Sequence, residues 1–371
     1  MKNKSENINV WSYLEEYKDY DTEILKIVSK VFKSGKLILG NNVKEFEENF
    51  SKWLGLKYGT GVGNGTDAIK LALLALGIGK DDEVITVSNT AVPTISAIVE
   101  TGAKPVFCDV TEKDYNISVE AIEELITKKT KAIVCVHLYG HPAEIKKINS
   151  ICKKYNLKLI EDCAQSHGSK YKDRFTGSFG DISAFSFYPT KILGAFGDGG
   201  MCVTNNKVLD SKLKMLRFYG MKENYYAEIE KGVNTRLDEV QAAILMFKLK
   251  RLKSDIEKRR KIAKTYNSNL SNTSLILPTE IKDFYHSYYL YVVRHPNREF
   301  LMKKLKENNI FVNISYPYPV HSMPPFRKYK KGNLKNTNKF SKEIFSLPMY
   351  PQLSLDKVEK VSYVLDKYAK R

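Results

Sequence analysis

One lysine, Lys191, lies between an apolar segment and a turn that is rich in glycine. Residues 183–188 have the composition of a strand, and four glycines follow Lys191 within the next nine residues. In an open α/β sheet, ligands and catalytic groups gather at the carboxyl ends of the strands. A lysine at such a place can form a Schiff base with an aldehyde cofactor such as pyridoxal phosphate (PLP). The alternative interpretation is a solvated loop lysine, which one motif alone does not exclude.

An acidic residue stands where a PLP enzyme needs one. Residues 157–162 predict a strand that ends in Glu161 and Asp162, and Asp162 lies 29 residues before Lys191. PLP chemistry requires a carboxylate beside the pyridine nitrogen, because the protonated ring accepts electrons from the reacting carbon. Asp162 is therefore a candidate for that role. Its alternative role is a helix cap after a strand.

A third candidate element is the glycine-rich segment 58–68, which precedes an apolar, helix-forming stretch at 69–76. Glycines let backbone N–H groups approach a phosphate, and the N-terminus of a helix attracts it. Thr66 adds a hydroxyl donor. A dinucleotide fingerprint fits less well, because the third glycine and the acid about 20 residues later are missing. No G-x-x-x-x-G-K-[ST] motif follows, so a nucleotide-binding module or dehydrogenase stays a second hypothesis.

Four motifs, in this order, resemble the DegT/DnrJ/EryC1/StrS family of PLP-dependent sugar aminotransferases. They occupy residues 63–68, 161–168, 185–200 and 232–244. Within the family, residues 88–92, 137–140 and 186–191 look most like enzymes that aminate C3 of dTDP-linked 3-keto-6-deoxy sugars. The resemblance implies PLP fold type I, the fold of aspartate aminotransferase, and normally a homodimer.

The resemblance also implies roles for single residues. Lys191 would form the Schiff base with PLP and move the proton during transamination, with L-glutamate as amino donor and 2-oxoglutarate as first product. Asp162 would pair with the pyridine nitrogen, and Gln165 would contact the ring hydroxyl. Gly65, Thr66 and Ser186 would bind the phosphate. Asn234 would reach the phosphate in the neighbouring subunit, so each active site would need both chains.

The sugar contacts and the ring-stacking residue are less defined. Residues 316–321 match a family segment that lines the sugar pocket, which makes Tyr316 and His321 candidate substrate contacts, and Arg236 is a third candidate. His321 has a structural alternative as a lone histidine in a proline-rich loop. Many family members carry an aromatic residue near Ala91 that stacks on the cofactor, whereas this chain has Asn-Thr-Ala-Val there.

Three classes of function compete. The first is a sugar aminotransferase that acts on a 3-keto sugar or, as an alternative, on a 4-keto sugar. The second is a PLP-dependent sugar 3-dehydratase of the same fold, and Lys191 argues against it because those enzymes carry histidine in place of the Schiff-base lysine. The third is a non-catalytic nucleotide-sugar-binding or regulatory relative, which would have no reason to keep Asp162, Gln165 and Lys191 together.

Alternating helices and strands predict an α/β fold. We expect strands at 83–87, 105–109, 131–137, 157–161 and 182–187, and helices at 21–33, 44–54, 67–77, 88–99, 118–127, 143–155 and 237–256. This order indicates a mostly parallel central sheet with helices on both faces. A strand at 287–293 and helices at 299–308 and 356–370 indicate a smaller α+β domain. A chain of 371 residues exceeds the size of one core. We therefore expect a large PLP-binding domain at 1–249, with an N-terminal helical segment, and a small domain at 250–371.

Composition excludes several other classes. The net charge of +18 is spread along the chain without a nucleic-acid motif, so we expect no nucleic-acid partner. A positive field would still attract a nucleotide diphosphate. We see no signal peptide and no apolar run long enough to span a membrane. Five cysteines without a C-x-x-C pair fit buried thiols in the cytoplasm. His137 and His141 lie on a strand-to-turn segment, so we expect no metal site.

Overall fold

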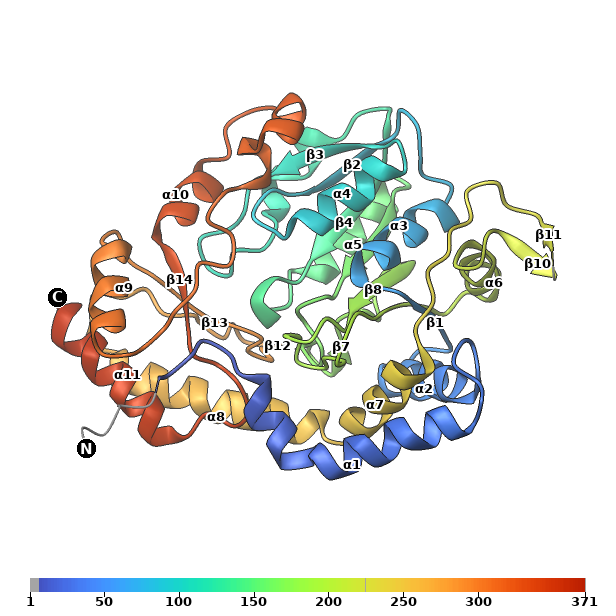
Figure 1. Ribbon diagram of the computed structural model, residues 1–371. Helices are drawn as coiled ribbons and strands as arrows, with labels where there is room; N and C mark the ends of the chain where they lie inside the picture. Colours follow the sequence, from blue (N-terminus) through green and yellow to red (C-terminus); the bar gives the residue numbers. More distant parts are fainter. Residues whose placement is uncertain (1–6, 224, 371) are drawn as a thin grey trace.

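A seven-stranded sheet lies at the centre of the molecule, with helices around it (Figure 1). The computed structural model describes residues 7–223 and 225–370. The strands lie in the order β1 (Tyr58–Val62), β9 (Gly200–Thr204), β8 (Ile182–Ser186), β5 (Lys158–Asp162), β4 (Thr130–Val136), β2 (Glu83–Val87) and β3 (Lys104–Cys108). Neighbours from β8 to β3 are parallel, and β9 runs antiparallel to β1 and β8. The predicted mostly parallel sheet is confirmed.

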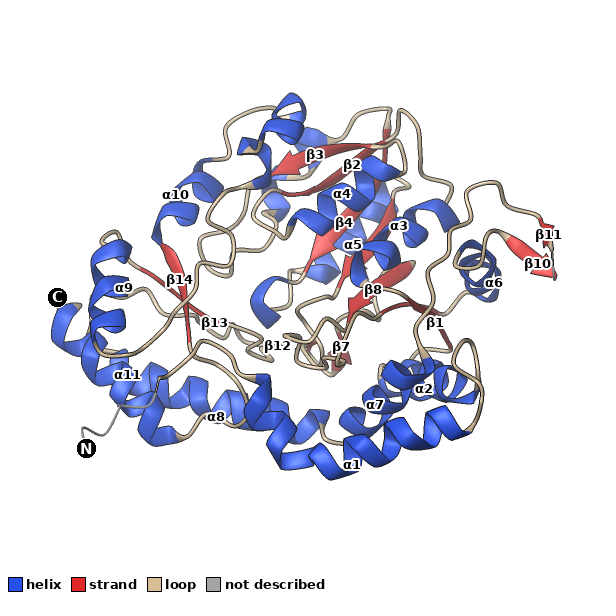
Figure 2. Ribbon diagram, in the orientation of Figure 1, coloured by secondary structure: helices blue, strands red, loops and turns tan. Residues whose placement is uncertain are grey.

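Helices and short strands surround this sheet (Figure 2). The helices are α1 (Tyr13–Lys33), α2 (Asn41–Trp53), α3 (Gly65–Ala75), α4 (Val92–Glu100), α5 (Ile145–Lys154), α6 (Lys207–Leu216), α7 (Glu239–Leu249), α8 (Leu252–Leu270), α9 (Arg298–Glu307), α10 (Lys335–Glu343) and α11 (Leu355–Tyr368). The short strands are β6 (Lys170–Tyr171), β7 (Arg174–Phe175), β10 (Met221–Glu223), β11 (Tyr226–Ala227), β12 (Phe284–Tyr285), β13 (Tyr291–Arg294) and β14 (Ile344–Leu347). Among the described residues, no helix combines the length and the apolar character needed to cross a membrane.

Successive residues of the central strands pack into different cores on the two faces of the sheet. In β4, Ala132 and Val134 join the core formed with α3, α4 and α6, whereas Ile133 and Cys135 join the core that contains α5. This is the alternation of a β-strand, and burial on both sides explains the continuous apolar runs in the sequence. All five cysteines are buried and unpaired, as predicted.

The C-terminal elements form a separate core. Helices α8, α9 and α11 pack with β13 and β14, and Figure 1 shows this group at one side of the molecule. Ile8 joins this core and pairs with Ile310. The division at residues 249 and 250 stays a prediction, and Ile8 shows that the N-terminal segment reaches the C-terminal core.

Three helix predictions, 88–99, 118–127 and 237–256, are wrong in extent. The first of these helices, α4, begins only at Val92. Residues 118–127 form two short 3₁₀ helices, η1 (Val119–Ala121) and η2 (Glu123–Leu125), rather than one α-helix. Their apolar residues recur every third position, which matches the three residues per turn of a 3₁₀ helix. The predicted helix 237–256 is divided between α7 and α8, and the Arg251 guanidinium at the junction lies 3.7 Å from the Tyr20 ring centroid. The predicted helix 21–33 matches the part of α1 that follows a kink at Tyr20, where φ is −142°. The helical turns before this kink, which include the contact of Tyr17 with Phe196, were not predicted.

The strand predictions missed β1 and β9, and the prediction at 287–293 is too long. Gly59 and Gly61 give β1 a weak strand pattern, but a Cβ at Gly59 would lie 2.5 Å from the Ser51 hydroxyl. Only Tyr291–Arg294 pairs in a sheet. Ser287 and Leu290 instead donate their backbone N–H groups to the carbonyls of Gly140 and Tyr139, so residues 287–290 form a loop against the end of β4.

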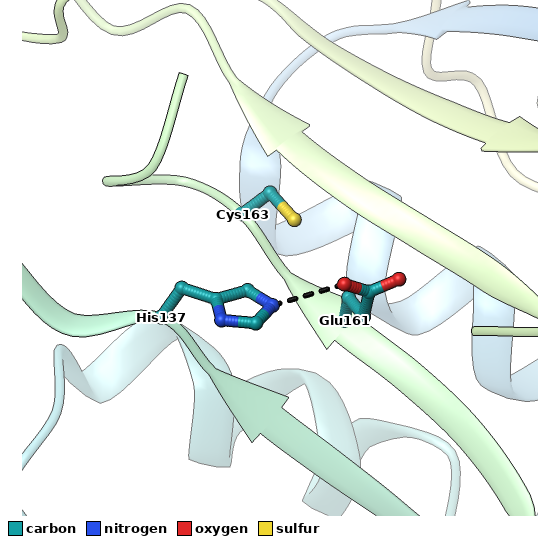
Figure 3. A group of neighbouring side chains, drawn as sticks. All are labelled: His137, Glu161 and Cys163. Carbon is teal, nitrogen blue, oxygen red and sulfur yellow. Dashed lines mark hydrogen bonds and ion pairs between the residues drawn. The ribbon is translucent and has the colours of Figure 1, made fainter. Parts of the chain in front are cut away.

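The carboxylate of Glu161, at the end of β5, is fully buried. Its hydrogen-bond donors are the backbone N–H groups of Gly177 (2.8 Å), Phe179 (2.7 Å) and Gly180 (2.7 Å), the hydroxyl of Ser183 (3.2 Å) and Nε2 of His137 (3.0 Å). Figure 3 shows the His137 ring directed at this carboxylate. Burial alone would raise the pKa of Glu161, but the bonds from His137 and the backbone outweigh it and lower that pKa. Glu161 therefore ties together β4, β5, β8 and the loop 177–180.

We expect Glu161→Gln to lower the free energy of unfolding by about 3 kcal/mol or more, because an amide NH₂ would replace an acceptor among buried donors. The measurement is urea denaturation followed by circular dichroism. Since the folded-state pKa is lowered, the carboxylate stabilises the fold above its unfolded pKa of about 4.3 and loses this effect as the pH falls. The difference in the free energy of unfolding between wild type and Glu161→Gln should therefore become smaller at acidic pH. Exposed Glu124→Gln is the control, and equal stability of both variants would contradict the prediction.

Candidate active site

A cavity of about 240 Å³ lies at the carboxyl ends of β5 and β8, beside the N-terminus of α3. Its lining residues include Asn64, Gly65, Thr66, Thr90, Ala91, Pro93, Thr94, Val136, Asp162, Ala164, Gln165, Ser186, Tyr188, Lys191 and Asp198. Six residues predicted from the sequence meet there, namely Gly65, Thr66, Asp162, Gln165, Ser186 and Lys191. They come from three segments that are far apart in the chain.

The first turn of α3 forms one end of the cavity. The Asn64 side chain caps the helix by accepting the Asp67 N–H at 2.8 Å. The first N–H groups of a helix have no carbonyl partner within it, so those of Gly65 and Thr66 can bind an anion. Gly65 lies tightly against β8, because a Cβ there would lie 2.6 Å from Cβ of Ser186. Only glycine permits this approach, which brings the Ser186 hydroxyl beside the helix N-terminus.

Asp162 forms another wall of the cavity. It is 4% exposed, and its carboxylate accepts hydrogen bonds from the Thr94 hydroxyl at 2.9 Å and the Ala164 N–H at 3.1 Å. Burial raises the pKa of Asp162, although these bonds and the nearby Lys191 oppose the rise. A cationic group against the carboxylate would favour its ionised form. Thr94 was not recognised from the sequence, where its only signal is its place one turn after Thr90, to whose hydroxyl it is bonded at 3.1 Å.

Lys191 follows the sharp turn after β8. Gly194 lies so close to the start of this turn that a Cβ would come within 2.5 Å of the Pro189 carbonyl. The Lys191 amino group lies over the ring of Tyr289, 4.9 Å from its centroid. The Tyr289 hydroxyl is 3.1 Å from the Thr190 hydroxyl. Tyr289 was not recognised from the sequence, because it lies inside the segment 287–293 that was predicted as a strand.

The orientation of Gln165 is set by its neighbours. Its carbonyl oxygen accepts the N–H of Tyr139 at 2.8 Å, and its amide nitrogen donates to the hydroxyl of Tyr316. An amide has two N–H donors, so one of them remains available at the cavity. Burial raises the pKa of Tyr316, so this hydroxyl keeps its proton. Tyr316 thus contacts the site through Gln165.

This set of groups fits PLP. Donors at the N-terminus of α3 and Ser186 suit its phosphate, a buried carboxylate suits its ring nitrogen, and a lysine suits its aldehyde. The tight contact of Gly65 with Ser186 is what such a phosphate cradle requires. The cavity therefore offers a complementary group to each reactive part of the cofactor.

Comparison with known proteins identifies the family. The sequence model of the DegT/DnrJ/EryC1/StrS aminotransferase family matches residues 18–366. The chain belongs to this family. It is thus a PLP-dependent aminotransferase of the fold that the sequence predicted.

Three relatives define the similarity more closely. The chain is 48% identical to the dTDP-3-amino-3,4,6-trideoxy-alpha-D-glucose transaminase of Micromonospora megalomicea, over 95% of this chain and 96% of the relative. It is 44% identical to the dTDP-3-amino-3,6-dideoxy-alpha-D-galactopyranose transaminase of Aneurinibacillus thermoaerophilus, over 94% and 96%. The crystal structure of S. venezuelae DesV in complex with a ketimine intermediate superposes with a TM-score of 0.96 at 35% identity, over 99% of this chain and 100% of that chain.

The other predicted residues lie outside the lining of this cavity. Asn234 is exposed, and the Arg236 guanidinium lies 5.3 Å from the centroid of the Phe218 ring. His321 is 2% exposed, and its Nδ1 atom is 2.7 Å from the Ser88 hydroxyl. This bond joins the segment 316–321 to the end of β2. The substrate roles of Tyr316, His321 and Arg236, and the phosphate role of Asn234, stay predictions.

Three side chains lie close enough together to be considered as metal ligands, but hydrogen bonds already use the ligand atoms of His137 and Glu161. Atoms of His137, Glu161 and Cys163 lie within 4.8 Å of one another (Figure 3). However, Nδ1 of His137 accepts the Ala143 N–H at 3.0 Å, so the proton on Nε2 is donated to Glu161. Burial also raises the pKa of the Cys163 thiol well above its usual value, which disfavours the thiolate. We interpret the cluster as a structural anchor for β4 and β5.

Gly65→Ala tests the phosphate cradle. The new Cβ would force the first turn of α3 away from Ser186, at a cost of about 1–3 kcal/mol for an overpacked site. We expect the dissociation constant of PLP to rise roughly 5- to 150-fold, measured by absorbance titration of the apoprotein. Gly79→Ala is the matched control, because its nearest neighbour would be 3.4 Å away. Wild-type PLP affinity in Gly65→Ala would show that the cradle does not bind the phosphate.

Proposed function

We propose that this aminotransferase transfers the amino group of L-glutamate to C3 of a dTDP-3-keto-6-deoxyhexose. The products would be 2-oxoglutarate and a dTDP-3-amino-3,6-dideoxyhexose. One observation carries the proposal: the cavity unites Lys191 and Asp162 with a phosphate cradle in a chain 48% and 44% identical to two transaminases named for dTDP-3-amino sugars. Such a product would supply surface glycans or glycosylated metabolites.

Each residue of the cavity has a separate role in the proposed transamination. When bound, PLP withdraws electrons from the reacting carbon and stores the amino group between the two half-reactions. Asp162 supplies a negative charge for the ring nitrogen, and Thr94 orients its carboxylate. The N-terminus of α3 and Ser186 hold the phosphate. Lys191 would be the base that takes the proton from Cα of the amino donor and delivers it to C4′ of the cofactor.

Two alternatives are weaker. Lys191 argues against a dehydratase that lacks the Schiff-base lysine, and the assembled cavity argues against a non-catalytic relative. A 4-keto sugar acceptor is chemically closer, because the same residues would serve it. The distinction depends on how the sugar is oriented by residues such as Tyr316, His321 and Arg236, which we propose as substrate contacts.

The reverse half-reaction distinguishes the two sugars. Mixed with the holoenzyme without glutamate, a dTDP-3-amino-3,6-dideoxyhexose should bleach the visible absorbance of bound PLP, because the amino group passes to the cofactor. The matched 4-amino isomer should react far more slowly, and Lys191→Ala is the negative control. Bleaching by the 4-amino isomer alone would make the protein a 4-aminotransferase. Reaction with neither sugar would overturn the proposed substrate.

We also propose a homodimer with shared sites, working in the cytoplasm. Asn234 is exposed, and Figure 1 shows the β10–β11 hairpin projecting from the body of the molecule. Tyr225, which lies between β10 and β11 in this hairpin, is 98% exposed. A groove lined by α1, α2 and α7 adjoins exposed apolar residues, including Phe32 and Leu37. Such apolar surface favours an interface between copies. The buried, unpaired cysteines suit a reducing compartment.

Mixed dimers test the shared site. Lys191→Ala and Asn234→Ala should each be inactive, but after subunit exchange one site of each mixed dimer would contain Lys191 and Asn234 intact. We expect about a quarter of wild-type activity, since half of randomly mixed dimers would carry one intact site of two. Lys191→Ala mixed with Asp162→Asn is the control, and it should recover nothing because both lesions lie on one side of the site. No recovery in the first mixture, with exchange confirmed, would mean that each chain forms its own site.

A further inference from the structure

We propose that Tyr289 is a positioning residue that holds the free amino group of Lys191 whenever this lysine is not bonded to the cofactor. The inference rests on the aminotransferase chemistry of the family and does not depend on the proposed sugar. Tyr289 comes from the loop before β13, far in sequence from β5, β8 and α3. The C-terminal part of the chain would thereby act directly on the catalytic lysine.

The contact itself is a cation–π interaction. The Lys191 Nζ atom lies 4.9 Å from the centroid of the Tyr289 ring, within the range in which an ammonium is attracted to a ring face. The hydroxyl at the far end of the ring is anchored 3.1 Å from the Thr190 hydroxyl. The residue before Lys191 therefore fixes the ring on which the Lys191 amine rests.

The backbone of Tyr289 is held as firmly as its ring. Arg259 of α8 is 3% exposed, and its guanidinium donates to the carbonyls of Tyr288 (3.3 Å), Tyr289 (3.2 Å) and Met349 (3.0 Å). On the other side, Gly140 has a φ of +96°, and a Cβ there would lie 2.8 Å from the Tyr289 nitrogen. A glycine is thus required where the loop meets the end of β4. These contacts leave Tyr289 little freedom to move.

The contact with Tyr289 would keep the Lys191 amine in place while it is not bonded to the cofactor. The first half-reaction would free Lys191 from its Schiff base, and the second would restore that bond. In between, the amine must stay close enough to carry a proton. A free lysine side chain has several rotatable bonds, and it loses entropy when it is held in one place. An ion pair with Asp162 would occupy the carboxylate that the cofactor needs. A ring face attracts the ammonium more weakly and leaves Asp162 available.

The first test uses the apoprotein and does not involve activity. In protein with ¹³C-labelled lysine side chains, the ε-methylene signal that is lost in Lys191→Ala belongs to Lys191. Because the ring current of Tyr289 shields groups above its face, this signal should lie upfield of the signals of lysines that have no ring beside them. Tyr289→Phe should keep the displacement, and Tyr289→Leu should abolish it. Tyr285→Leu, in which the lost ring lies near Lys170 rather than Lys191, should leave it unchanged.

The second test measures proton transfer. Tyr289→Leu should lower kcat about 2- to 30-fold, the range that corresponds to a cation–π contact. KM for glutamate should change little, and the isotope effect with α-deuterated glutamate should increase. Tyr289→Phe should restore most of kcat. If Tyr289→Leu does not fold, Tyr289→Met removes the ring while keeping a side chain of similar length. An unshifted Lys191 signal in wild type, or a wild-type kcat and isotope effect in the folded ring-free variant, would overturn the proposal.

Discussion

The buried carboxylate of Glu161 determines where the active site can form. It joins the end of β4 and the start of β8 to β5, and it holds the loop 177–180 against them, through hydrogen bonds from five groups. Adjacent residues of a strand point to opposite faces, so the same stretch of β5 that directs Glu161 into the scaffold directs Asp162 into the cavity. Glu161 holds the end of β5 in place, and Asp162 lines the cavity.

The two carboxylates differ because their environments differ. Glu161 is surrounded by donors, which outweigh burial and lower its pKa, whereas Asp162 has two donors and burial raises its pKa. Asp162 is therefore the carboxylate that still lacks full compensation for its charge. A protonated ring nitrogen would supply that compensation, so under the proposed role of Asp162 the binding of PLP and the ionisation of this carboxylate would favour each other.

The C-terminal part of the chain completes this site through a segment that departs from regular structure. Residues 287–290 would extend β13 if they paired in a sheet, but their backbone groups bond to Gly140 and Tyr139 instead. This places Tyr289 over Lys191, while Tyr316 bonds to Gln165. Both contacts would couple the C-terminal part of the chain to the reacting groups, and under the proposal above this part would contribute to catalysis as well as to stability.

The sequence by itself determined the family and the α/β fold. It also singled out six candidate residues that meet in one cavity, because glycine spacing and strand ends are local patterns: Gly65, Thr66, Asp162, Gln165, Ser186 and Lys191. The sequence did not reveal β1 or β9. The glycines of β1 give it a weak strand pattern, and the antiparallel pairing of β1 with β9 is decided by strands that are distant in the chain. The break between α7 and α8 was not predicted either. The roles of Thr94 and Tyr289 were also not recognised from the sequence. Thr94 contacts Asp162, and Tyr289 contacts Lys191, only after the chain has folded. Because the partners are far apart in the chain, no local sequence pattern links them, and only the tertiary structure decides that they meet.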